Sequence, residues 1–283
     1  MSSLSKPQRR SLGTLIGGAA YGRAFRRIEP ALDADAAKYL AAVEAADNQV
    51  LEDGVKRAVS AFVRACKADG NWDAIKASCI LCGARTLAGA LVPLKGAAPT
   101  NYNFVGLGTD YTRDGGLQGD GSTKYLNSNR NNNADPQDDR HLSVFVSSAE
   151  SSGNAGVYTG VKLNVTGSNG FGRSSTVSNL FVRNVSANAV IISGKGAATG
   201  FMGTERNVPS GFNFRANGAN TTHSQTSQLP LAANTYIFAA NDLGGIAFPT
   251  NARLAFYSIG EAVDLATLDT AVSTLVSEIG AAV

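Results

Sequence analysis

The chain contains two histidines, His141 and His223, and one of them lies in a pattern that could support nucleophilic catalysis. In the segment DDRHLS, Asp139, His141 and Ser143 occupy alternate positions, so on a β-strand they would share one face. Neighbouring side chains on a strand seldom take up the angles that a Ser-His-Asp triad requires, and no nucleophile-elbow turn is visible. We therefore expect His141 to be a surface or edge histidine, and we assign no catalytic residue.

The carboxylates of the second half do not form the pair that glycoside hydrolysis requires. A retaining glycosidase holds its two carboxyl groups about 5–5.5 Å apart. Between residues 100 and 260 the two glutamates are Glu150 and Glu205, far apart in the sequence, and the aspartates fall in predicted loops and turns. We expect a protein that is not an enzyme and needs no cofactor. A glycan-degrading enzyme is the least favoured alternative.

Oxygen-bearing side chains are concentrated in residues 129–139, NRNNNADPQDD. Ca²⁺ takes about 6–8 oxygen ligands, but this segment has no defined ligand spacing. Asn and Asp also dominate ordinary turns, because their side chains bond the local backbone. We favour the turn interpretation over a calcium site and predict no bound metal.

Sugar binding is the other chemistry that this region could support. Aromatic platforms with nearby amides and carboxylates hold sugars, and aromatic residues lie close to the polar loops at Tyr102, Phe104, Tyr111, Tyr125 and Tyr158. These rings could equally fill the core of a β-sandwich. The candidate glycan-binding residues are Tyr111, Tyr125, Asn129, Asn131 and Asp135.

Three cysteines, Cys66, Cys79 and Cys82, do not indicate a disulfide framework, because their number is odd. Cys79 and Cys82 form a C-x-x-C motif without a second pair or a nearby histidine, so a four-ligand zinc site lacks ligands. Both lie in an apolar run, where cysteine packs as a small hydrophobe. We predict that they are core residues.

Residues 31–95 read as a helical module. The segment LDADAAKYLAAVEAAD has capping aspartates followed by apolar residues at helical spacing. In the next segment Val55, Val59, Phe62, Val63 and Cys66 form one stripe, which indicates an amphipathic helix with Gly70 near its end. Residues 71–92 are predicted to continue as further helix.

Residues 96–259 show a different period. Short alternating runs such as HLSVFVSS, in which Leu142, Val144 and Val146 alternate with other residues, are bounded by Gly, Asn or Ser. No helical pattern intervenes, so the strands must pair as an antiparallel sandwich or barrel. The predicted fold is mainly β, an antiparallel β-sandwich with an N-terminal helical module and a C-terminal helix.

The last segment, residues 260–283, is predicted to be that helix. Its apolar residues are spaced alternately three and four apart, which fits a coiled-coil seam or a helix packed on its own sandwich. Both alternatives stay open. From the seam we predict a homo-oligomer, a trimer, held by Leu265, Leu268, Val272, Leu275 and Ile279.

Residues 1–30 are strongly basic, with six Lys and Arg against one Glu, which gives +5. We interpret them as an arm that docks on a partner; nucleic acid is not favoured, and a solubilising tail is the alternative. No window is apolar enough to span a bilayer, and no signal peptide is expected. The docking residues of this arm are Arg9, Arg10, Arg23, Arg26 and Arg27.

Two stretches resemble the concanavalin A-like, laminin G-type jelly roll. One is GLQGDGSTKYLNSN followed by HLSVFVSSAE; the other runs from NTYIFAAND to GEAVDLATLDT. Together with the helical segment DAAKYLAAVEAAD (residues 35–47), they are similar to structural proteins of tailed bacteriophages. The resemblance covers about residues 33–283.

The resemblance implies a virion location and other virion proteins as partners. A tail fibre or tail-tip component is favoured, with a lectin-like sandwich facing a host surface glycan. A capsid decoration or head-fibre protein is the alternative.

Overall fold

The first two helices form where their sequence pattern predicts them. The computed structural model describes residues 31–151 and 153–283, so the predicted docking arm, residues 1–30, lies outside the described residues. Helix α1 (Ala34–Asp47) begins where Asp33 accepts hydrogen bonds from two backbone N–H groups of its first turn. Helix α2 (Asp53–Ala68) buries its predicted stripe, and Gly70 follows it in a left-handed conformation.

The predicted third helix is wrong. After the single turn α3 (Asn71–Ala74) the chain enters strand β1 (Ile75–Ile80), and only the short α4 (Leu87–Ala90) follows. Strand β1 pairs antiparallel with β17 (Arg253–Gly260), a partner that lies far away in the sequence. A short apolar run does not by itself distinguish a buried helix from a strand. The buried, unpaired cysteines Cys66, Cys79 and Cys82 confirm the core prediction.

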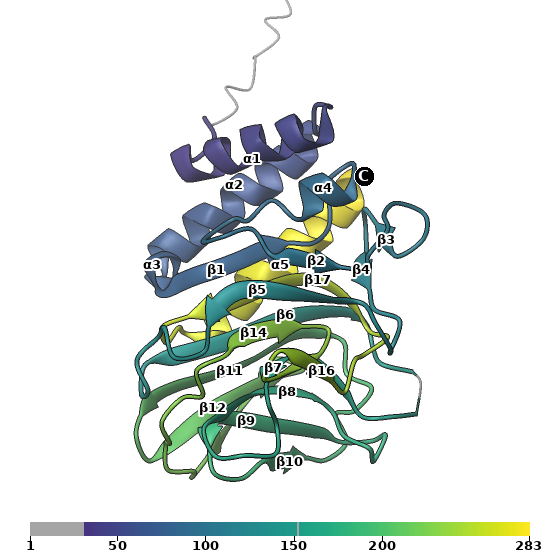
Figure 1. Cartoon of the computed structure of the whole chain (residues 1–283). Coiled ribbons are helices and arrows are strands. Elements are labelled where there is room, and N and C mark those ends of the chain that lie inside the picture. The colour runs from purple at the N-terminus through teal and green to yellow at the C-terminus, as the bar shows by residue number, and fades with distance from the viewer. Residues whose placement is uncertain (1–30, 152) are drawn as a thin grey trace, which may run out of the picture. The chain divides into compact units, whose positions relative to one another are not determined.

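Two sheets form the sandwich, as the alternating runs predict (Figure 1). Within the described residues, sheet A has the order β13-β12-β11-β6-β17-β4-β3, with β1 paired to β17. Besides β1 and β17, its strands are β3 (Tyr111–Thr112), β4 (Gly116–Gln118), β6 (Arg140–Ser148), β11 (Gly200–Val208), β12 (Gly211–Ala216) and β13 (Ala219–His223).

Sheet B has the order β10-β9-β8-β7-β14-β5-β2, with the β15–β16 hairpin attached to β7. Its strands are β2 (Thr100–Tyr102), β5 (Tyr125–Asn131), β7 (Gly156–Val161), β8 (Ser168–Arg173), β9 (Leu180–Ser186), β10 (Val190–Ile192), β14 (Asn234–Ile237), β15 (Ala240–Asp242) and β16 (Gly245–Ala247). The arrangement fits a jelly-roll sandwich.

The two sheets pack face to face through alternating side chains. Leu142, Val144 and Val146 of β6 are at most 1% exposed, as their alternation predicts. Phe171 of sheet B meets Phe214 of sheet A edge to face, with ring centroids 5.5 Å apart. These contacts place the core between the sheets.

The outer face of sheet A is covered by helices. Phe62 of α2 packs against Phe256 of β17, with ring centroids 5.7 Å apart. Helix α5 (Leu265–Ala282) crosses β11 and β13, and its Asp269 forms an ion pair with Arg215 of β12. The chain therefore has three layers here: helices, sheet A and sheet B.

The predicted oligomer seam is buried within the chain. Leu265, Leu268, Val272, Leu275 and Ile279 are all at most 3% exposed, because α5 turns this stripe onto sheet A and α2. An oligomer seam and a helix packed on its own sandwich require the same apolar stripe. In the structure, α5 packs on its own sandwich. These five residues therefore give no support to the predicted trimer.

The predicted domain boundaries at residues 95 and 259 do not separate structural units. Residues 32–283 form one compact unit, because β1 of the predicted helical module completes sheet A and α5 packs onto it. Among the described residues, no helix combines the length and apolar character needed to cross a bilayer.

Candidate functional site

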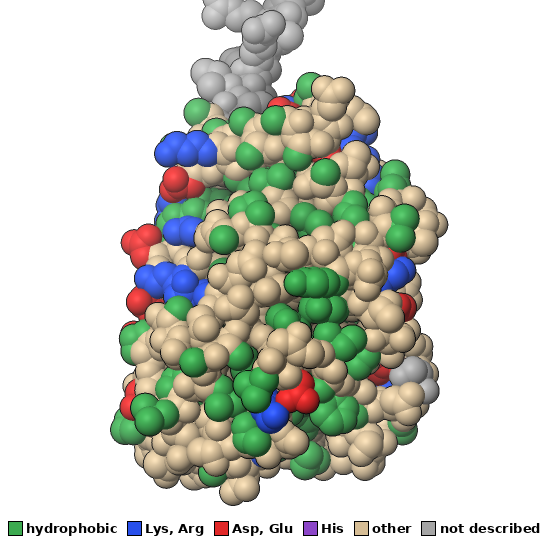
Figure 2. All heavy atoms as spheres, viewed as in Figure 1, with side chains coloured by type: hydrophobic (Ala, Val, Ile, Leu, Met, Phe, Trp, Pro, Cys, Tyr) green, Lys and Arg blue, Asp and Glu red, His purple; other side chains and the backbone are tan. Residues whose placement is uncertain are grey.

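Among the residues that the structure describes, no helix covers the outer face of sheet B, and this face presents aromatic side chains. Figure 2 shows this face with hydrophobic side chains gathered over the region of β2 and β5 and again around β16, where Figure 1 places these strands. Charged groups on it include the ion pair of Lys162 with Asp242, 2.7 Å apart. Exposed apolar patches of this kind mark interaction surfaces.

A row of three tyrosines crosses strands β2, β5 and β14. Tyr102 and Tyr125 are direct cross-strand partners, and their rings stack in parallel with centroids 4.3 Å apart. Tyr236 of β14 lies diagonally beyond, with its ring centroid 4.8 Å from that of Tyr125. We call these residues the tyrosine row.

The tyrosine row offers hydroxyls and one ring face. The stacking covers the facing sides of Tyr102 and Tyr125, while Tyr102, on edge strand β2, is 37% exposed and keeps its other side free for a ligand. Partial burial, together with the phenols of Tyr236 and Tyr102, raises the pKa of Tyr125 to about 12. Tyr125 is therefore a neutral hydrogen-bonding hydroxyl at neutral pH.

An apolar hollow of about 230 Å³ lies farther along the same sheet. Phe181 of β9 and Phe248, which follows β16, supply its aromatic rings, and Asn164, Ser174 and Ser175 supply polar groups. Its other lining residues are Ala155, Leu163 and Ala189. An apolar hollow with a few polar groups at its rim is a typical small-ligand site. We call it the phenylalanine hollow.

Phe248 is held in an unfavourable backbone conformation at this hollow. Its φ is +51°, a left-handed value that is costly for a bulky residue, and half of its side chain is exposed. Its carbonyl accepts a hydrogen bond from the Val157 N–H at 2.8 Å, which fixes it to β7. Strain of about 1–3 kcal/mol at an exposed aromatic residue is characteristic of functional positions.

Two of the predicted glycan-binding residues are on the open face of β5. Tyr125 belongs to the tyrosine row. Asn129 lies four residues further along β5 and is exposed. The Asn129 amide donates hydrogen bonds to the Ala98 carbonyl at 2.8 Å and to the Thr100 hydroxyl at 3.0 Å. Asn129 therefore holds the preceding loop in place beside the row.

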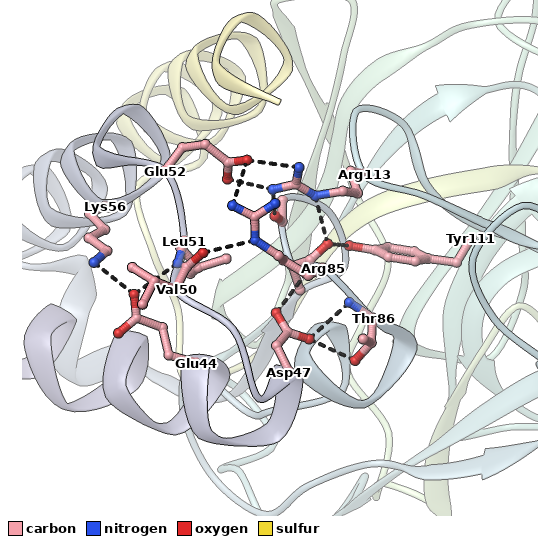
Figure 3. Close-up of polar contacts among 12 residues, drawn as sticks. Glu44, Asp47, Val50, Leu51, Glu52, Lys56, Arg85, Thr86, Tyr111 and Arg113 are labelled. Carbon is pink, nitrogen blue, oxygen red and sulfur yellow. Dashed lines mark hydrogen bonds and ion pairs between the residues drawn. The ribbon is translucent and has the colours of Figure 1, made fainter.

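The other three predicted residues have structural contacts. Tyr111 is fully buried, and its hydroxyl donates to the Ala84 carbonyl at 2.6 Å (Figure 3). Asp135 is 6% exposed and forms an ion pair with Arg130. Asn131 is half-buried, and its side chain accepts the N–H of Asn133 at 3.1 Å. The prediction of Tyr111, Asn131 and Asp135 as ligand contacts has no support in this geometry.

The network around Tyr111 joins the helices to the sandwich. Glu52 accepts two hydrogen bonds from Arg113 and pairs with Arg85, while Asp47 accepts from the backbone and hydroxyl of Thr86 (Figure 3). Bidentate arginine–carboxylate pairs are strong and geometrically specific. This part of the chain is a junction between elements rather than an open site.

The polar segments quoted for the family resemblance form turns. Partial burial alone would raise the pKa of Asp120, but N–H groups of Lys124, Thr123 and Ser122 and the Thr123 hydroxyl outweigh it and lower the pKa to about 2. The side chains of Asn127 and Asn131 likewise accept the backbone N–H groups of Asn129 and Asn133. Among the described residues, no cluster of three or more His, Cys, Asp or Glu could hold a metal ion.

His141 is not a surface or edge residue, because it lies within sheet A and is 1% exposed. Its Nδ1–H donates to the Glu261 carbonyl at 2.5 Å, and its Nε2 accepts from the Ser258 hydroxyl at 2.9 Å. Ser143 is 2.7 Å from Ser258, and Asp139 accepts the backbone N–H of Ala262 instead of contacting the ring. No triad forms.

Four aromatic residues of the open face are absent from the predicted glycan-binding residues, although Tyr102 is among the aromatic residues noted close to the polar loops. Phe181 lies between Leu180 and Val182, and Tyr236 precedes Ile237, so the sequence does not show which of these rings points outward. For Tyr236 the alternation along the strand does not indicate the outward face, because β14 is bulged against β5. Phe248 precedes Pro249, a turn signal that could have placed it in an exposed loop.

No protein-family model and no curated protein matches the chain. Among solved structures, the binding domain of botulinum neurotoxin serotype D is 13% identical with a TM-score of 0.47, over 70% of this chain and 51% of that one. A serotype D ligand-binding domain in complex with N-acetylneuraminic acid is 14% identical with a TM-score of 0.45, over 74% and 52%.

A leech intramolecular trans-sialidase is 12% identical with a TM-score of 0.36, over 48% of this chain and 23% of that one. The chain spans about half the length of the neurotoxin domains that it matches. These similarities are too weak to carry an inference about activity. The β-sandwich assignment rests on the two sheets themselves.

Proposed function

We propose that this chain is a non-enzymatic, lectin-like adhesion module whose open face on sheet B binds a glycan. The observation that carries the proposal is Phe248, an exposed ring held in a strained conformation over a hollow with amide and hydroxyl groups at its rim. Aromatic rings pack against the C–H face of a sugar, and polar groups bond its hydroxyls. The tyrosine row extends this surface across the sheet.

The positions of the glutamates support a non-catalytic role. Glu205 lies opposite His141 near the start of β6, whereas Glu150 lies two residues beyond the end of that strand. At about 3.3 Å per residue the two are roughly 30 Å apart, far more than glycoside hydrolysis allows. Glu150 also accepts hydrogen bonds from the Thr250 hydroxyl and the Asn251 N–H, both at 2.6 Å, which gives it a structural role.

Binding of the full chain to an array of bacterial surface polysaccharides tests the proposal. We expect at least one glycan to bind, and Phe248→Ala to weaken that binding at least about tenfold, the effect of losing roughly 1.4 kcal/mol. Val208→Ala is the matched control, because Val208 is 46% exposed on sheet A and should bind normally. Binding to no glycan, or equal binding by Phe248→Ala, would refute it; release of sugar from the bound glycan would refute the non-enzymatic part.

The location that we propose is the virion of a tailed phage, in a tail fibre or tail tip. Its support is the sequence resemblance of residues 35–47 and of GDGSTKYL to phage structural proteins. Immunogold labelling of purified particles tests it. Gold on the tail is the expected result, gold over the head would favour the decoration alternative, and unlabelled particles would refute a virion location.

A further inference from the structure

A polar hollow of about 410 Å³ opens at the other sheet, where β11, β12 and β13 meet the segment that leads into α5. It lies apart from the glycan surface proposed above, which is on sheet B. Within residues 31–151 and 153–283, no lysine, arginine or aromatic residue lines it. Its lining residues are Asp69, Asn71, Glu205, Asn207, Asn213, Asn220 and residues 262–265.

Glu205 is the most buried of the three carboxylates in this hollow, with 4% of its surface exposed. Its Oε2 accepts a hydrogen bond from the Asn213 amide at 2.9 Å, and its Oε1 has no hydrogen-bond partner within residues 31–151 and 153–283. Burial raises the pKa of Glu205, and the carboxylates of Asp264 and Asp139 raise it further. The Asn213 hydrogen bond and the charge of Arg206 act in the opposite direction, but the net shift of the pKa is upward, so the carboxylate is only partly compensated.

The cations around the hollow have other partners. Arg215 touches the rim by donating to the Asn220 side chain, but it is paired with Asp269 at 2.7 Å. Lys76 is paired with Glu261 at 2.9 Å. Arg206, the next residue after Glu205, donates its hydrogen bonds to backbone carbonyls, including that of Asn184 at 2.8 Å. None of the three donates a hydrogen bond to the Glu205 carboxylate.

We infer that this hollow binds one organic cation, an ammonium or guanidinium group, against the free carboxylate oxygen of Glu205. A cation at the free oxygen completes the compensation of this carboxylate, which a neutral sugar hydroxyl does not. The carboxylates do not form a metal-ligand group, and the volume exceeds what one bare ion fills. The amides of Asn207 and Asn213 would bond the polar atoms next to the cation.

Titration of the full chain with two matched probes tests this inference. Nα-acetyl-lysine amide carries the cation, and Nα-acetyl-norleucine amide has the same backbone with a neutral chain. We expect calorimetry to detect binding of the lysine probe and at least about tenfold weaker binding of the norleucine probe. Equal binding of both probes would overturn the inference, and so would binding of neither probe by both the full chain and the full-length variant with Arg9, Arg10, Arg23, Arg26 and Arg27 changed to Gln.

Two variants locate the binding. Glu205→Gln keeps the shape and the Asn213 contact but removes the charge, so the lysine probe should bind at least about tenfold more weakly. Asn207→Lys, at an exposed rim position, should fill the hollow with a tethered cation and abolish binding even if Glu205→Gln fails to fold. Asp242→Asn, an acidic residue on sheet B, is the control and should bind normally. Unchanged affinity in Asn207→Lys would contradict the assignment.

The same titration distinguishes two sources of the cation. The chain carries its own basic segment, residues 1–30, and an outside ligand is the other source. In a full-length variant with Arg9, Arg10, Arg23, Arg26 and Arg27 changed to Gln, tighter binding of the lysine probe would identify this segment as a competing occupant. Unchanged affinity would identify an outside amine or guanidine as the ligand.

Discussion

The two sheets of the sandwich differ in what covers them, and their outer faces differ accordingly. On sheet A the helices bury the polar residues His141, Ser143 and Ser258, which form an internal chain of hydrogen bonds. On sheet B, Tyr102 and Phe248 stay in contact with solvent, and Phe248 has a strained backbone. Buried polar groups must find partners within the fold, whereas an open face can keep groups for a ligand. The comparison separates residues that stabilise from residues that bind.

The largest expected effect is on the covered side. Leu268 of α5 is fully buried between the helix layer and sheet A, so Leu268→Ala should lower the free energy of unfolding by about 2–5 kcal/mol. Chemical denaturation measures this loss. Val208→Ala, at an exposed position, should change stability by less than about 0.5 kcal/mol. If Leu268→Ala keeps its stability but shows a lower oligomer mass, the apolar stripe of α5 is an oligomer seam after all.

His141 should make the covered side sensitive to pH. Burial lowers its pKa to about 4 from an ordinary value of 6.5, although the Glu261 carbonyl opposes the shift. Between these values the unfolded chain binds a proton that the folded chain does not, so stability falls as pH decreases from about 6.5 to about 4. A difference of about 2.5 pKa units corresponds to roughly 3 kcal/mol.

Denaturation at several pH values checks the His141 prediction. His141→Gln should remove most of this pH dependence, whereas His223→Gln, at a partly exposed position, should retain it. If the two variants show the same pH profile, His141 is not the group that titrates.

The smallest effect on stability is expected on the open side. Phe248→Gly removes an exposed ring and relieves a left-handed φ, so the free energy of unfolding should change by less than about 1 kcal/mol in either direction. The same variant should lose glycan binding. A loss of several kcal/mol would show that Phe248 belongs to the core, and the contrast between the two faces would fail there.

The elements that the sequence predicts correctly are those with a repeated local pattern. Helix α2 has five apolar residues on one stripe, and β6 alternates over its length, so each pattern has a single interpretation. Strand β1 has no such pattern. Its six residues become a strand because β17 pairs with them, and no pattern in the residues around β1 indicates that pairing.

The candidate site was predicted less well for a related reason. Which face of a strand is open depends on where α2 and α5 pack, and a heptad stripe in α5 fits an oligomer as well as its own sheet. Tyr125 and Tyr111 are both predicted from their position close to polar loops, but Tyr111 is a core residue. Hollows such as the one at Glu205 join strands and loops that the sequence keeps apart.

The pairing of β1 with β17 also determines when this fold can be completed. Cys79 and Tyr257, which touch across these strands, are 178 residues apart. At synthesis rates of about 5–20 residues per second, β1 leaves the ribosome roughly 9–36 s before its partner does. During that interval its apolar run has no sheet to join, and non-local pairing of this kind is slow. Newly made chains should therefore depend on chaperones until the last strand has been translated.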